Sequence, residues 1–219
     1  MTKNKFNSVF ADGYPPPHHM LRDLDVSLEL RGDGPSTIIA PVTPGICTDH
    51  GGVQVGIIAT LVDILGGALS IRAVHPDWAA TADLTVHTTG RPTSGRVSAA
   101  GSLIRAGNTM IVIDVDIREE EDLASGQWTS IGSGLISFAR LPRREDTITV
   151  DFGVEATHTY QFAIEGSGLQ RIYLEEIGAK VVDEAGGVVE LHLSDYVRNS
   201  FGALQGGIVA ILADMAGQY

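Results

Sequence analysis

Apolar and polar residues alternate in the first patterned part of the chain, residues 25–30, which read Asp-Val-Ser-Leu-Glu-Leu. Alternation with a period of two predicts a strand with one buried face. A Gly-Asp-Gly-Pro turn separates it from a second predicted strand, residues 37–42. Residues 56–71 are apolar almost all round, so a helix formed by them must be buried on most sides. The His-Pro-Asp sequence at residues 75–77 is expected to end that helix.

Four further strands are predicted after the helix, because Val, Ile and Thr dominate four runs that turn-forming residues separate. These runs are residues 80–88, 95–105, 109–118 and 128–141. Two strands, a buried helix and four strands favour an α+β fold in which an antiparallel sheet wraps around a single long helix. Residues 1–23, which include three consecutive prolines, are expected to form an irregular N-terminal segment.

An internal repeat appears when the chain is shifted by 151 residues, so that residues 46–67 lie on residues 197–218 without a gap. Eight of the 22 aligned pairs are identical, among them a Gln, an Asp and several Gly residues. Residues 179–182 and 188–193 fall on the first two predicted strands at the same offset. The sequence therefore predicts a tandem repeat.

The repeat divides the chain into a first unit, residues 24–141, a linker, residues 142–168, and a partial second unit, residues 169–219. The second unit contains the counterparts of the first two strands and the start of the central helix. No counterpart of the four later strands follows it in this sequence. Leaving the apolar face of the second helix without a covering sheet is costly. We therefore expect either that this sequence is a fragment or that its C-terminal part is supplied or dispensed with in another way.

Composition narrows the classes of partner. The chain of 219 residues has 15 Lys and Arg against 27 Asp and Glu, and its net charge of −12 repels phosphate backbones and anionic lipid. We therefore expect neither a nucleic acid nor a membrane as a partner. Cys47 is the single cysteine, which excludes an internal disulfide and a cysteine-based zinc site and is typical of a cytoplasmic protein.

An aspartate interrupts each of the two apolar helices in the same register, Asp63 in the first and Asp214 in the second. Burying an ionised carboxylate without a partner is expensive. The alternative is that the helix emerges into solvent at that turn and leaves the carboxylate hydrated. Because the placement occurs twice, the sequence favours a functional role for both aspartates.

Each helix is preceded by a glycine-rich stretch, residues 51–56 and residues 202–207. Backbone N–H groups at a helix N-terminus suit a carbonyl oxygen that becomes an oxyanion, and glycine lets a ligand approach closely. Glycine before a helix is common, however, so this signal alone is weak.

The spacing within one helix is too long for one small reacting group, since seven residues separate Gly56 from Asp63, roughly 10 Å along a helix. Two such helices packed antiparallel would place Asp63 near Gly206-Gly207 and Asp214 near Val55-Gly56. The repeat thus predicts two sites, each assembled from both units.

These residues resemble the hotdog fold of acyl-CoA thioesterases, and in particular the phenylacetic-acid-pathway (PaaI-like) branch. The second copy carries the pattern N-x-x-G-x-x-[HQ]-G-G as Asn199, Gly202 and Gln205-Gly206-Gly207, followed by Leu-x-Asp at Asp214. The first copy departs from the pattern, with Thr48 in place of Asn and Val55 in place of the first paired Gly. Gln54 and Gln205 stand where many members carry His.

The resemblance implies a mechanism without a metal or an organic cofactor. A helix N-terminal amide of one unit would polarise the thioester carbonyl, and the aspartate of the other unit would act as a general base on water or as a nucleophile. The small-molecule substrate would be an acyl-CoA lying along the outside of the sheet. Arg91, or Arg105 with Asn108, would meet its phosphates. The resemblance also implies a homo-oligomer.

Four other interpretations of the sequence are alternatives to this one. A non-catalytic acyl-CoA or lipid-binding hotdog module is the main alternative, whereas a hotdog hydratase would need an Asp-x-x-x-x-His motif that is absent near the helix. Cys47, Asp49 and His50 are adjacent residues, which rarely converge on one reacting atom. His18-His19 follow the prolines, and we expect them to be too mobile for a metal site.

Overall fold

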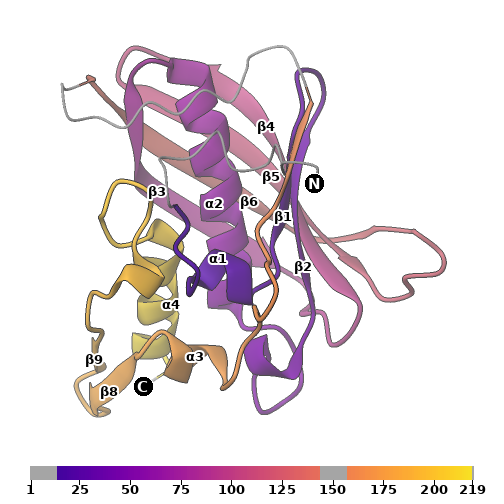
Figure 1. The fold of residues 1–219 in the computed structure, drawn as a ribbon, viewed down its shortest axis with the longest axis vertical. Helices are drawn as coiled ribbons and strands as arrows, with labels where there is room; N and C mark the ends of the chain where they lie inside the picture. Colours follow the sequence, from indigo (N-terminus) through magenta and orange to yellow (C-terminus); the bar gives the residue numbers. More distant parts are fainter. Residues whose placement is uncertain (1–13, 144–156, 219) are drawn as a thin grey trace.

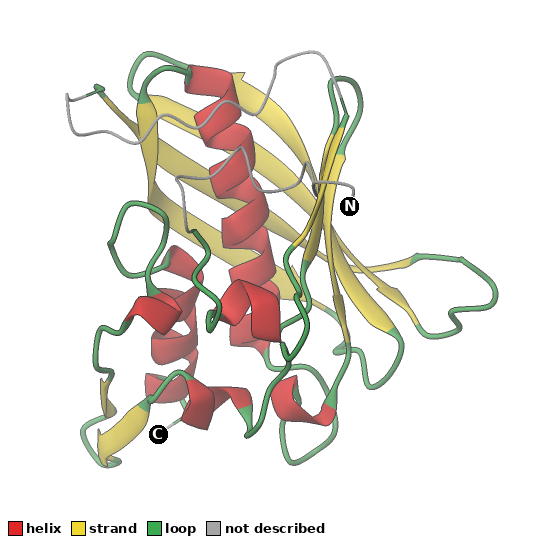
Figure 2. Ribbon diagram, viewed as in Figure 1, coloured by secondary structure: helices red, strands yellow, loops and turns green. Residues whose placement is uncertain are grey.

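The computed structural model of the protein describes residues 14–143 and 157–218. A long helix lies along the concave side of a curved sheet, and a smaller C-terminal part packs beside one end of that helix (Figures 1 and 2). The elements, in chain order, are α1 Met20–Asp23, β1 Ser27–Leu30, β2 Ser36–Pro41, the 3-10 turn η2 Pro44–Ile46, α2 Val55–Val74, β3 Trp78–Thr88, β4 Arg96–Ala106, β5 Met110–Glu120, β6 Thr129–Leu141, β7 His158–Gln161, α3 Tyr173–Glu176, β8 Lys180–Asp183, β9 Val188–Glu190, the 3-10 turn η3 Asp195–Val197 and α4 Gly206–Ala216.

The main sheet has seven strands in the order β3-β6-β5-β4-β2-β1-β7, and each neighbouring pair is antiparallel. Strands β1 to β6 follow the predicted runs with shifts of one or two residues at their ends. Helix α2 packs into the concave face, where Gly66 lets it approach Phe138 so closely that a Cβ there would lie 2.9 Å from the ring. The predicted α+β fold, with an antiparallel sheet wrapped around one buried helix, is confirmed.

Helix α2 is long and apolar enough to cross a membrane, with a mean hydropathy of 1.8. Within the fold, however, 72% of its most apolar window is buried. Its hydropathy is therefore that of a core helix covered on most sides, as the apolar pattern predicts.

Two segments have more structure than the sequence predicts. The linker, residues 142–168, contributes β7, which extends the main sheet by pairing with β1. The irregular N-terminal segment, residues 1–23, contains the short helix α1. Residues 1–13 and 144–156 of these two segments lie outside the described residues.

The entrances to α2 and α4 have the same backbone geometry. A 3-10 turn precedes each, and an isolated antiparallel bridge follows it, Cys47 with Val53 in the first unit and Arg198 with Leu204 in the second. Each tip has a glycine in the left-handed region, Gly51 with φ 93° and Gly202 with φ 77°. The 151-residue offset of the sequence therefore also relates the two backbones.

The two central helices differ in how they are covered. On α2, Ile58 is 1% exposed because the sheet lies over it, whereas its counterpart on α4, Val209, is 53% exposed. Strands β8 and β9 form a separate small sheet. Among the described residues, this face of α4 is therefore not covered by a large sheet.

Candidate functional site

Helices α2 and α4 cross at glycines, and this contact brings the two units together. A Cβ on Gly207 would lie 2.5 Å from the Cα of Thr60, and one on Gly56 would lie 2.9 Å from the Cα of Ile211. Only glycine permits such an approach of two backbones. The N-terminus of each helix consequently lies beside the aspartate of the other, so the predicted antiparallel packing is confirmed.

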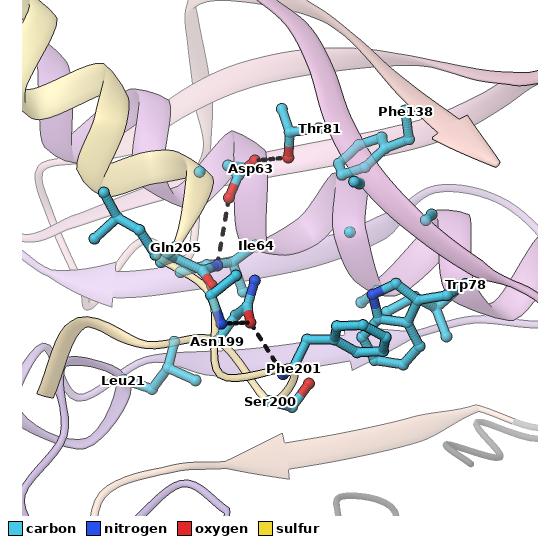
Figure 3. Close-up of a pocket in the computed structure, with 18 of the residues that line it drawn as sticks. Leu21, Asp63, Ile64, Trp78, Thr81, Phe138, Asn199, Ser200, Phe201 and Gln205 are labelled. Atoms are coloured by element: carbon cyan, nitrogen blue, oxygen red, sulfur yellow. Dashed lines mark hydrogen bonds between the residues drawn. The ribbon is translucent and has the colours of Figure 1, made fainter. Parts of the chain in front are cut away.

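Asp63 is 3% exposed and accepts hydrogen bonds from three donors, of which Figure 3 shows Thr81 and Gln205. Its Oδ1 accepts from the hydroxyl of Thr81 at 2.6 Å. Its Oδ2 accepts from the backbone N–H of Gly207 at 2.9 Å and from the side-chain amide of Gln205 at 3.3 Å. Burial raises the pKa of Asp63 above its ordinary value, and the bonds from Thr81 and Gly207 offset part of that rise.

Asp214 has a weaker environment in the matching position. It is half-buried, and its Oδ2 accepts from the N–H of Gly56 at 3.4 Å, half an ångström longer than the bond from Gly207 to Asp63. The amide of Gln54 donates to the carbonyl of Cys47 at 3.3 Å. The two predicted sites are thus both assembled from two units, but they are unequal.

A cavity of about 410 Å³ opens at Asp63, and Asp214 is not among the residues that line it. Its polar end consists of Asp63, Thr81, Gln205 and Gly206. The remainder is mostly apolar, with Trp78, Phe138 and Phe201 among the residues that line it. The rings of Trp78 and Phe201 stack with centroids 4.5 Å apart, so one aromatic wall comes from both units (Figure 3).

Asn199 shapes the loop before α4. Its Oδ1 accepts from the backbone N–H groups of Phe201 at 2.9 Å and of Ala203 at 3.0 Å, and the residue also lines the cavity. The side-chain amide therefore fixes the turn that presents Phe201 to the cavity and leads into Gln205.

Two residues at the site had no signal in the sequence. Thr81 lies in β3, eighteen positions after Asp63, and only the closure of the sheet over α2 brings its hydroxyl to the carboxylate. His19, which we expected to be mobile, is 1% exposed and bonded to the backbone of the second unit, so that prediction is wrong. Burial lowers the pKa of His19 to about 4, so the imidazole is neutral near pH 7.

The residues predicted to meet CoA phosphates lie outside the cavity at Asp63. Arg91, Arg105 and Asn108 are exposed, and none of them lines the cavity at Asp63. Arg91 packs on Gly52, where a Cβ would lie 2.9 Å from the arginine Cβ, at the entrance to α2. It therefore belongs to the same end of the crossing as Asp214.

The remaining candidates show no catalytic arrangement. Cys47 is half-buried, and its thiol donates to the carbonyl of Thr43 at 3.3 Å. Among the described residues, no group of three or more His, Cys, Asp or Glu side chains is placed to hold a metal ion.

An antiparallel sheet wrapped around one long buried helix is the architecture of the hotdog fold. No family model matches the chain. A protein of Halobacterium salinarum named "Putative esterase" is 34% identical over 139 residues, which cover 60% of this chain and 90% of that protein.

Solved structures show the same fold. A thioesterase of Haemophilus influenzae has a TM-score of 0.51 with 17% identity, covering 57% of this chain and 85% of its own. A variant of a Staphylococcus aureus protein has a TM-score of 0.51 with 20% identity, covering 57% of this chain and 100% of its own. The chain therefore belongs to the same family as the Halobacterium salinarum protein, and it has the hotdog fold of these solved structures.

Proposed function

We propose that the chain hydrolyses an acyl-CoA thioester to a free acid and CoA at the Asp63 site. The observation that carries the proposal is the buried carboxylate of Asp63, which faces the N-terminus of α4 at the polar end of an apolar cavity. An acyl chain suits the apolar part, and the thioester carbonyl then lies at the polar end of the cavity, beside both the carboxylate and the helix N-terminus.

The N–H of Gly206 is the donor to the carbonyl oxygen. Gly206 lines the cavity as the first residue of α4, and among the described residues its N–H has no hydrogen-bond partner. The positive end of the helix dipole adds to this donor as negative charge develops on the oxygen. The N–H of Gly207 donates to Asp63 instead. The two adjacent amides therefore have different roles, one towards the substrate carbonyl and the other towards the carboxylate.

Asp63 supplies the base or the nucleophile. As a base it takes a proton from the water whose oxygen attacks the acyl carbon, and that proton then goes to the departing sulfur of CoA. As a nucleophile it attacks the acyl carbon itself, the C–S bond breaks and CoA leaves as a thiolate. Water then hydrolyses the resulting anhydride, which releases the free acid and restores the carboxylate, and the proton released from that water goes to the CoA thiolate. In both routes Thr81 and Gln205 keep the carboxylate in place through the bonds described above.

The Asp63 site is proposed as the working one because both of its halves are intact. The first unit supplies Asp63 and the sheet that walls the cavity, while the second supplies Asn199, Gln205 and the paired glycines. At the other site Val55 replaces the first of these glycines, which puts a side chain where Gly206 has none. The shared backbone geometry of the two helix entrances supports our proposal that the two units are copies of one ancestral unit. We propose that, of the two sites formed between these units, the one at Asp63 has kept its chemistry.

The proposal is tested by thiol release from acyl-CoA esters of graded acyl length and of aromatic type, with matched oxygen esters as a control. We expect thiol release at rates that depend on the acyl group. Saturable binding of acyl-CoA without thiol release would instead identify a non-catalytic binding module.

A further inference from the structure

A segment of the N-terminal region, residues 14–22, packs against the second unit beside the cavity. We call it the N-terminal strap. Two of its residues, Tyr14 and Leu21, line the cavity. The strap is itself held firmly, because the guanidinium of Arg22 donates to the carbonyls of Pro15 at 2.6 Å and Pro16 at 2.8 Å, and to Phe162 just after β7 at 2.8 Å. It is therefore a fixed part of the fold and not a loose tail.

His19 is the buried polar residue of the strap, and its hydrogen bonds define its tautomer. The Nδ1 atom accepts from the backbone N–H of Leu21 at 3.2 Å, at the start of α1. The proton of the neutral ring is then on Nε2, which lies 2.9 Å from the carbonyl oxygen of Arg198 and donates to it. The hydroxyl of Tyr14 donates to the same carbonyl at 3.3 Å.

Arg198 is the residue from which the loop of the functional site starts. It pairs with Leu204 across the loop in the isolated bridge, and Asn199 follows it directly. Residues 198–205 then lead into α4 and carry Gln205 to the carboxylate of Asp63. A contact that fixes Arg198 therefore fixes the base of this loop.

The first unit lacks this arrangement at the corresponding place. The counterpart of Arg198 is Cys47, whose carbonyl accepts from the amide of Gln54 at 3.3 Å. In the second unit the strap takes over that carbonyl, and the amide of Gln205 is directed to Asp63 instead. Of the two equivalent glutamines, Gln54 and Gln205, only the one whose loop is contacted by the strap donates to a carboxylate.

We propose that His19 is a positioning residue, whose Nε2–H holds the loop of residues 198–205 so that Gln205 and the first amides of α4 meet Asp63. Tyr14 assists through the same carbonyl. The inference rests on the proposed function for its effect on turnover, but the placement of the loop can be measured without a substrate. A loss of alignment of about 1 Å is expected to cost one to two orders of magnitude in rate.

A matched pair of variants separates the two hydrogen bonds of His19. In His19→Asn the short amide keeps an acceptor for the N–H of Leu21 and cannot reach Arg198. In His19→Gln the longer amide keeps the donor to Arg198 and loses the acceptor near Leu21. His18→Gln is the control, because His18 is exposed in the same strap, with 68% of its side chain accessible.

We expect kcat for thiol release to fall about tenfold or more in His19→Asn, with amide hydrogen exchange accelerated within residues 199–205. His19→Gln and the control are expected to keep kcat within about twofold and to keep the exchange rates of the loop. Equal losses in both His19 variants, or unchanged exchange in His19→Asn, would overturn the inference. If the wild type releases no thiol, the proposed function fails, and the exchange rates alone decide whether His19 holds the loop.

Discussion

Gly206 packs directly against Asp63 where the two halves of the site meet, and Gly206→Ala tests this contact. The added Cβ would lie 2.5 Å from the Oδ1 and 2.9 Å from the Cγ of Asp63. An ordinary contact is about 3.4 Å or longer, so the carboxylate or the helix end must move by nearly 1 Å. Because an error of about 1 Å in a reacting group costs roughly 100-fold, kcat should fall by about that factor.

The stability of Gly206→Ala is expected to change much less than its rate. Alanine is better than glycine in a helix by up to about 1 kcal/mol, and weakening one bond to Asp63 costs about the same. The assay pairs thiol-release kinetics with thermal unfolding. Val55→Gly is the control, because Val55 is the counterpart of Gly206 at the Asp214 site and this variant removes its side chain. Its rate of thiol release should equal that of the wild type.

A wild-type rate in Gly206→Ala would refute the reasoning, because it would mean that Asp63 and the start of α4 do not act on one reacting group. A rate that falls only together with the unfolding temperature would refute it as well. Gly207→Ala provides the comparison for a purely structural effect, because its Cβ would lie 2.5 Å from the Cα of Thr60 and should lower stability strongly.

Two further predictions concern protons. Thr81→Val removes a hydrogen bond that lowers the pKa of Asp63. The acid limb of the plot of kcat against pH should therefore move to higher pH, and kcat should fall about tenfold. An unmoved acid limb would show that Thr81 does not act on Asp63. Burial lowers the pKa of His19 from 6.5 to about 4, so the unfolded chain binds this proton more readily than the native one. Stability should therefore be lost as pH falls from 6.5 towards 4, by about 3 kcal/mol in urea unfolding, and His19→Gln should lack that part of the loss.

The sequence predicts the crossing of the two helices correctly because its signals are local and repeated. The apolar run around Asp63, the glycines before each helix and the 151-residue offset together require antiparallel packing if one small group is to meet both Asp63 and Gly206. Strands β1 to β6 of the main sheet follow from alternation and β-branched residues in the same way, with errors only at their ends.

The residues that the sequence does not reveal depend on contacts between distant segments. Thr81 reaches Asp63 only because β3 passes over α2, and a lone threonine in a strand has no pattern that signals this role. His19 follows three prolines, which favour irregular chain, yet it is buried because the second unit covers it. Strand β7 has only four residues, too few for a clear alternation, and it forms because β1 offers a free edge.

The most direct test of the proposed chemistry compares Asp63→Asn with Asp214→Asn in thiol release from the best acyl-CoA ester. Asn keeps the size of the side chain but is neither a base nor a good nucleophile. We predict that Asp63→Asn lowers kcat by at least about 100-fold while Asp214→Asn keeps a rate close to that of the wild type. Full activity in Asp63→Asn, or a loss confined to Asp214→Asn, would contradict the assignment of the working site.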